Sequence, residues 1–249
     1  MMTITVHPTV AEQGRAAAEA GIALLRETLD EKETATIALA AGSSQFAMLQ
    51  VLTAAPDLPW HRVTAFPLDE YVGLDVTHPA SFRRFLWERF VSQLPLPLRA
   101  FRHIEGKVDD PTAESVRVSR LLRDREIDVA FIGIGENGHI AFNDPPADFD
   151  TEEPYIVVEL DERCRQQQIG EGWFAILDEV PHEAISMSVH RLMTSRHLIC
   201  SVPEKRKAEA VQAAVEGPVT SRLPASILQD HESCRLFLDD ESASLLKSS

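Results

Sequence analysis

Apolar residues along this chain follow two spacings in turn, one typical of buried strands and one typical of helices. Short, nearly continuous apolar runs occur at residues 36–40, 62–66 and 127–134. Between them, apolar residues recur every three or four positions, as on the buried face of a helix. Strands and helices that alternate in this way predict a mostly parallel, Rossmann-like sheet with helices on both faces.

Local start signals place several of the expected helices. Thr9 and Glu12 form a capping box before a helix that runs to about Leu29, and Asp110-Pro111 opens another. The expected helices are residues 10–29, 45–53, 79–90, 111–125 and 204–215. The expected strands are residues 36–40, 62–66, 127–134, 155–160, 197–202 and 235–238. We expect a single α/β domain over residues 1–249, with functional residues at the carboxyl ends of the strands.

Charge and cysteine content narrow the class of function. The chain has 39 acidic and 24 basic residues, a formal net charge of −15. This charge argues against nucleic acid or an anionic membrane as a partner, although one pocket can still gather cations for a small anion. Cys164, Cys200 and Cys234 are too widely spaced for a metal site and too few for a disulfide framework. We expect no bound metal and a reducing compartment.

Two segments bear on the location of the protein. The N-terminal residues 1–7 do not resemble a signal peptide. The uncharged stretch 34–56 is long enough to suggest a membrane span, but the polar residues 42–45 divide it into a strand and a helix. We therefore expect a cytoplasmic protein without a membrane-spanning segment.

A glycine-rich segment follows the run at 127–134 and matches the G-x-G-x-x-G pattern of dinucleotide-binding turns at 133–138. That pattern requires a helix to open at its third glycine. Here Pro145 and Pro146 follow closely and prevent a helix from continuing. We therefore expect no nicotinamide cofactor, and interpret the segment as a turn that presents His139, an amide and a carboxylate.

Two further loops contain candidate chemistry. Gly42, Ser43 and Ser44 lie between an expected strand and helix, where a phosphate could bind, although a simple serine N-cap explains them equally well. No Walker lysine follows, so a nucleoside triphosphate is not expected. Asp69 and Glu70 follow another strand. Adjacent acids are usually solvated, but Asp69 has apolar neighbours, and a partly desolvated carboxylate can act as a base near neutral pH.

These segments together resemble one enzyme family. The pair Leu68-Asp-Glu-Tyr-Val-Gly-Leu74 and Gly133-x-Gly-x-Asn-Gly-His-Ile-Ala-Phe-Asn143 resembles the glucosamine-6-phosphate deaminases, also called isomerases. These are related to the 6-phosphogluconolactonases. Further segments that look like the family are residues 41–44, 78–81, 207–217 and 224–229. Phe142-Asn143 favours the deaminase branch, because lactonases typically have serine-leucine-phenylalanine there.

The resemblance implies a cofactor-independent reaction on an amino sugar phosphate: ring opening, proton transfer between C2 and C1, and loss of ammonia. It assigns Asp69 as the proton-carrying base and His139 to ring opening. Asp144 would orient the histidine. Asn137 stands where the best-known members have aspartate, and Asp144 stands where glutamate is usual. An asparagine can still hydrogen-bond, but it cannot raise the basicity of the histidine by its charge.

The resemblance also implies how the sugar phosphate is held. The expected phosphate contacts are Gly42, Ser43, Ser44, Arg165 and Lys207. Arginine would supply a planar set of donors and lysine a point charge. Glu70, Tyr71 and Gly135 are further expected members of the site.

The family resemblance also bears on regulation, on oligomeric state and on the alternatives to a deaminase. Residues 166–174 lie where a mobile lid is expected. The chain stops soon after 235–238, whereas allosterically activated members use a longer carboxyl end, so we expect a monomer or small homo-oligomer with weak or no regulation. Two alternatives remain: a lactonase in which His139 activates water, and a non-catalytic sugar-phosphate sensor.

Overall fold

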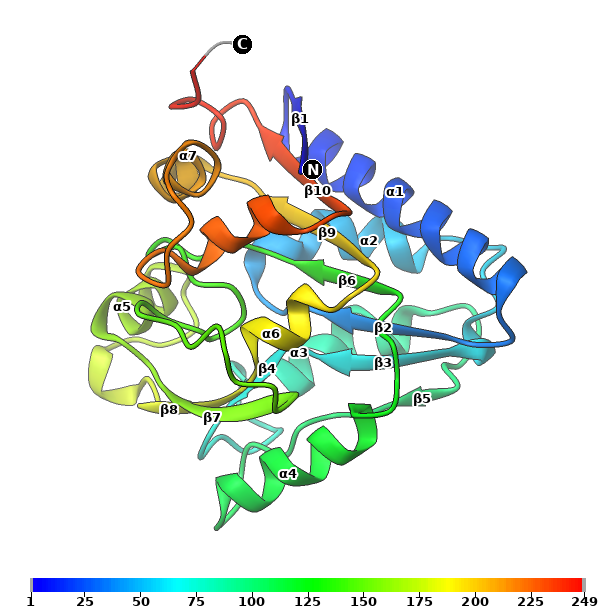
Figure 1. The fold of residues 1–249 in the computed structure, drawn as a ribbon. Coiled ribbons are helices and arrows are strands. Elements are labelled where there is room, and N and C mark those ends of the chain that lie inside the picture. The colour runs from blue at the N-terminus through cyan, green and yellow to red at the C-terminus, as the bar shows by residue number, and fades with distance from the viewer. Residues whose placement is uncertain (1, 248–249) are drawn as a thin grey trace.

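The computed structural model describes residues 2–247, and a parallel sheet forms its centre (Figure 1). The strands are β1 Thr3–His7, β2 Ala35–Leu39, β3 Val63–Pro67, β4 Asp69–Tyr71, β5 Ala100–Phe101, β6 Val129–Ile132, β7 Tyr155–Glu159, β8 Glu183–Met187, β9 His197–Val202 and β10 Cys234–Asp239. Within the described residues, seven strands pair in the order β1-β10-β9-β6-β2-β3-β5, every pair being parallel. This confirms the expected α/β architecture.

Helices cover both faces of this sheet. They are α1 Val10–Glu31, α2 Phe46–Thr53, α3 Phe82–Arg89, α4 Pro111–Leu122, α5 Glu162–Gly170, α6 Val189–Met193 and α7 Ala208–Glu216. Buried residues of α1, α2 and α3 form one apolar cluster with the sheet, and those of α4, α6 and α7 form another. Because both faces are covered, every residue of β2, β3 and β6 is buried. This explains why these strands read as continuous apolar runs.

Helix starts depend on side chains that accept backbone N–H groups. The Thr9 hydroxyl accepts from Glu12 N at 3.2 Å, as expected for the start of α1. The expected start of α3 at Pro79 was wrong: Ser81 caps this helix by accepting from Arg84 N, so the helix begins three residues later. At α7, a short 3₁₀ turn, Lys205–Lys207, precedes the regular helix.

A second, smaller sheet was not expected. Among the described residues, β4, β8 and β7 pair antiparallel in that order. The run expected as a strand at 155–160 therefore belongs to this sheet and not to the parallel one. The strand β4 has only three residues, two of them acidic, and only pairing with β8 gives it an extended conformation.

The order of the strands brings four loops to one edge. From β2 the chain adds β3 and β5 on one side, and it then returns to add β6 on the other. The carboxyl ends of β9, β6, β2 and β3 are therefore adjacent around the point where the winding direction changes. Ligands bind at this position in sheets of this type. No helix within residues 2–247 is long and apolar enough to cross a membrane.

Candidate active site

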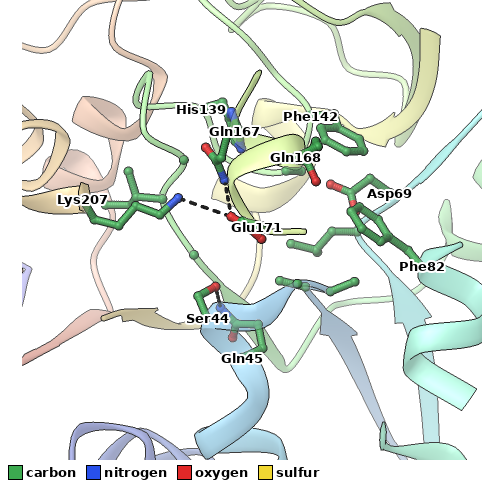
Figure 2. A pocket seen from close by; sticks show the side chains of 18 residues that line it. Ser44, Gln45, Asp69, Phe82, His139, Phe142, Gln167, Gln168, Glu171 and Lys207 are labelled. Atoms are coloured by element: carbon green, nitrogen blue, oxygen red, sulfur yellow. Dashed lines mark hydrogen bonds and ion pairs between the residues drawn. The ribbon is translucent and has the colours of Figure 1, made fainter. Parts of the chain in front are cut away.

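A cavity of about 60 Å³ lies at this edge of the sheet. It is lined by the loop after β2, the start of β4, the turn after β6, one face of α5 and the residue that precedes α7 (Figure 2). Gly42, Ser44, Asp69, His139 and Lys207 all line this cavity. Residues more than 160 positions apart in the sequence thus share one site, as the family resemblance implied.

Asp69 is a buried acid that lines this cavity. It is the first residue of β4, and its side chain points into the cavity from the side opposite Lys207 (Figure 2). Asp69 is only 6% exposed. Burial, and to a lesser degree the charge of Glu70, raises the pKa of Asp69 well above its ordinary value. A carboxyl group in this state is suited to accept and return a proton near neutral pH.

Glu70, next along β4, does not line the cavity and instead supports its wall. Its carboxylate accepts hydrogen bonds from Ser81 Oγ at 2.8 Å and from the backbone N–H groups of Phe82 and Arg83 at 3.1 and 2.7 Å. Burial raises the pKa of Glu70 to about 6, against the lowering effect of these donors. Glu70 thus fixes the start of α3 beside the site.

Tyr71 also acts from behind the cavity. Its hydroxyl donates to Gln168 Oε1 at 2.7 Å. Its ring packs against Phe82, Phe142 and Phe174 at centroid distances of 4.9 to 5.6 Å. Because Gln168 lines the cavity, Tyr71 positions a side chain of α5 that a ligand would meet.

His139 lies in the turn that follows β6 and also lines the cavity. Its Nδ1 is 3.1 Å from Asp144 Oδ1. The turn contains no helix, as the two prolines predicted. A Cβ on residue 135 would lie 2.2 Å from His139 Cε1, so only glycine at this position allows the ring to lie where it does.

Asn137 connects two carboxylates behind the histidine. Its Nδ2 donates to Asp144 Oδ1 at 2.8 Å and to Asp161 Oδ2 at 3.0 Å, and its Oδ1 accepts from His139 N at 3.1 Å. Burial would raise the pKa of Asp144, but His139, Asn137 and the backbone N–H of Asp161 outweigh it and hold the pKa below the ordinary value. The amide of Asn137 thus neutralises no charge, but it donates a hydrogen bond to each of the two carboxylates.

Lys207 lines the other end of the cavity. Lys207 is 2% exposed, and burial lowers its pKa against the opposing effect of Glu171. Arg206 lies beside it, with its guanidinium 3.4 Å from Ser43 Oγ. The sequence interpretation did not include Arg206; the basic run at 205–207 was the available signal. It also omitted Glu171, whose carboxylate lies between these groups.

Arg165 is not part of this cluster. Its guanidinium donates to the carbonyl oxygens of Leu177 at 2.7 Å and of Val180 at 3.0 Å, and it does not line the cavity. The structure therefore does not bring Arg165 together with Lys207, and the guanidinium near Ser43 belongs to Arg206. Helix α5 turns its glutamine face to the cavity and its arginine toward the segment that follows, a distinction that depends on how the helix is rotated.

One group of side chains in the described part of the chain could ligate a metal. His139, Asp144 and Cys164 each offer one atom, all within 4.8 Å of one another. A metal ion there would occupy both the histidine and its carboxylate partner.

Comparisons with known proteins agree with this geometry. The model of the family described as glucosamine-6-phosphate isomerases/6-phosphogluconolactonase matches residues 8–237. A glucosamine-6-phosphate deaminase of Streptococcus pneumoniae (strain Hungary19A-6) is 37% identical over 212 residues, 85% of this chain and 87% of the relative. A glucosamine-6-phosphate deaminase of Exiguobacterium sibiricum is 38% identical over 223 residues, 90% of this chain and 86% of that protein.

Solved structures share the fold. One described as a monomeric glucosamine-6-phosphate deaminase superposes with a TM-score of 0.90 at 30% identity, covering 98% of this chain and 100% of the other. A putative 6-phosphogluconolactonase of Neisseria gonorrhoeae gives a TM-score of 0.77 at 21% identity, covering 96% and 100%. At that identity the second likeness concerns the fold alone.

Proposed function

The chain belongs to the glucosamine-6-phosphate isomerase/6-phosphogluconolactonase family, and we propose that it is a glucosamine-6-phosphate deaminase. The observation that carries this proposal is that one cavity is lined by a buried acid, Asp69, by a histidine beside a carboxylate, His139, and by a buried cation, Lys207. The reaction converts glucosamine 6-phosphate and water into fructose 6-phosphate and ammonia.

Each end of the cavity has a separate task in this proposal. The phosphate binds at Lys207, Arg206 and the loop 42–44, because cations and hydroxyl donors gather there and oppose the acidic net charge locally. The sugar then extends toward His139 and Asp69. The serine loop (residues 42–44) and Lys207 thereby set the position of C1 and C2 relative to the two groups that transfer protons, His139 and Asp69.

Proton transfer follows from the two acid–base groups. His139 takes the proton of the C1 hydroxyl and returns one to the ring oxygen, which opens the ring, and Asp144 stabilises the charged imidazole. Asp69 removes the proton from C2 of the open aldehyde and delivers it to C1, while the aldehyde oxygen gains a proton and the ammonium group at C2 loses one. This leaves an imine at C2, which water hydrolyses to the ketone with release of ammonia. None of these steps requires a cofactor.

The apolar surroundings of Asp69 favour this role over that of a solvated acid. In water an aspartate is too weak a base for a carbon-bound proton, and desolvation makes it stronger by raising its pKa. Lactone hydrolysis, the alternative within the family, needs a base for water but no carrier between two carbons. A buried carboxyl at position 69 therefore supports the deaminase.

The decisive experiment measures products without any added cofactor. Purified protein should release ammonia and fructose 6-phosphate in equal amounts from glucosamine 6-phosphate, and should not hydrolyse 6-phosphogluconolactone above the spontaneous rate. The opposite pattern would identify a lactonase, and saturable binding without turnover would identify a sensor. We further propose a cytoplasmic monomer or small homo-oligomer acting in amino sugar breakdown, consistent with three free, buried cysteines.

A further inference from the structure

The carboxylate of Glu171 lies among the groups that would bind the phosphate. Ser43 Oγ donates to Glu171 Oε2 at 3.1 Å. Glu171 Oε1 is 3.3 Å from the guanidinium of Arg206 and 4.0 Å from Nζ of Lys207, the latter drawn as a dashed line in Figure 2. A carboxylate of this chain therefore takes the position of an anionic ligand between the serine loop and the two cations.

Its own segment completes the set of donors. Gln167 Nε2 donates to Glu171 Oε1 at 2.7 Å, and Trp173 Nε1 donates to Oε2 at 3.3 Å. The side chain is only 6% exposed. Burial would raise the pKa of Glu171, but Lys207 and Arg206 outweigh that effect and hold it below the ordinary value. The group is thus ionised at neutral pH.

Glu171 and a bound phosphate exclude one another. The cavity of about 60 Å³ is far below the roughly 300 Å³ or more of a typical ligand pocket. A phosphate on Lys207 would also bring two anions into contact with the same cation. The phosphate can bind only after the carboxylate has left.

The backbone on both sides of Glu171 allows its carboxylate to move out of the phosphate site. Helix α5 ends at Gly170, and Gly172 has φ of +80°, a conformation that favours glycine. A Cβ on either glycine would meet no atom within 4 Å. The residues on both sides of Glu171 therefore have open space around them.

We infer that Glu171 is a specificity-determining residue: its carboxylate is the resident anion of the phosphate site, and it selects for ligands that carry a dianionic phosphate. The inference rests on the proposed function in that it takes this end of the cavity as the phosphate site. A monoanion that replaces Glu171 is attracted to Lys207 about as strongly as the carboxylate was. A dianion has one more negative charge and is attracted more strongly. Arg206 pairs with Glu204 and Glu136 as well as with Glu171, so its charge is shared among three carboxylates and Lys207 contributes more to this discrimination.

Only those molecules in which Glu171 has left the site can bind an added anion. The apparent affinity for that anion is therefore reduced in proportion to the fraction of molecules with a vacant site. Glu171→Gln removes the charge at nearly constant size, so inorganic phosphate should bind about tenfold more tightly than to the unaltered protein. Asp178→Asn is the matched control, since it removes one exposed charge from the same segment and should change nothing. Unchanged or weaker phosphate binding in Glu171→Gln overturns the inference.

The discrimination between charges has its own test. In Glu171→Ala the site is vacant, so acetate, a monoanion, should bind measurably and the preference for inorganic phosphate over acetate should fall relative to the unaltered protein. An unchanged preference shows that Glu171 does not select for the dianion. Both ligands are followed by calorimetry, which requires no turnover.

The unaltered protein offers a third measurement in case either variant does not fold. Trp173 loses its hydrogen-bond acceptor when Glu171 leaves, so inorganic phosphate should change the tryptophan fluorescence, and Trp173→Phe should abolish that change. A phosphate complex with no change in Trp173 overturns the inference. If these results are obtained but no ammonia is released from glucosamine 6-phosphate, the proposed function fails while the role of Glu171 stands.

Discussion

Oδ1 of Asp144 lies 3.1 Å from Nδ1 of His139, and the same oxygen accepts a hydrogen bond from Asn137. A carboxylate in this position stabilises the imidazolium that forms during ring opening. Asp144→Asn should therefore lower kcat by about 100-fold or more with little change in KM, measured as ammonia release. Asp150→Asn, at an exposed position six residues further along the chain, is the control. A variant with normal kcat would remove Asp144 from the mechanism.

Asp69→Asn should abolish deamination while inorganic phosphate still binds, because an amide of the same shape cannot carry a proton. In the unaltered enzyme the base must be ionised. Since the pKa of Asp69 is raised well above its ordinary value, kcat/KM should rise with pH through an acid limb above the usual range of an aspartate. Turnover by Asp69→Asn, or a limb near 3.8, would contradict this assignment.

Arg206 and Arg165 should respond differently to truncation. Arg206→Ala should raise KM for the sugar phosphate about tenfold, because its guanidinium reaches Ser43 at the phosphate end. Arg165→Ala should leave KM unchanged and lower the free energy of unfolding by about 1 to 3 kcal/mol, because it strands the carbonyls of Leu177 and Val180. Steady-state kinetics and urea unfolding of both variants decide the matter; the reverse pattern would restore Arg165 to the phosphate site.

Asn137→Asp, which introduces the residue that the family resemblance led us to expect at this position, should destabilise this protein. The amide donates to Asp144 and Asp161, so a third carboxylate would remove both donors and add repulsion, at a cost of about 2 kcal/mol or more at pH 7. Repulsion raises the pKa of carboxyl groups in the folded state, so the loss should shrink as the pH falls toward 5. Unfolding curves at both pH values test this; equal losses would exclude the charge explanation.

Glu70 links stability to pH. Its pKa is raised from 4.5 to about 6 in the folded protein, so its contribution to stability is fully present below 4.5 and is lost as the pH rises through 6. The difference corresponds to about 2 kcal/mol. The free energy of unfolding of the unaltered protein, compared with that of Glu70→Gln, should therefore fall by about this amount between pH 4.5 and 7. A constant difference would show that the hydrogen bonds of Glu70 offset its burial.

Much of the site follows from local sequence. The apolar runs of β2, β3 and β6 predict a parallel sheet, and the polar residues just beyond them are then bound to meet at one edge. The prolines at 145 and 146 separate the turn at His139 from a dinucleotide-binding turn without any knowledge of the fold. Asp69 and His139 were singled out in this way, Lys207 was included only through the family resemblance, and all three line one cavity.

Other features depend on contacts between distant segments. Whether α5 presents Arg165 or Gln168 to the cavity depends on the rotation of the helix, which Tyr71 and the carbonyls at 177 and 180 fix. The extended form of Asp69–Tyr71 depends on its pairing with β8. The sequence by itself thus determined the buried strands at the centre of the parallel sheet and the polar residues that follow them, because both depend on local spacing. The tertiary structure alone decided that Glu171 lies between Arg206 and Lys207, because 35 residues or more separate that carboxylate from both cations along the chain.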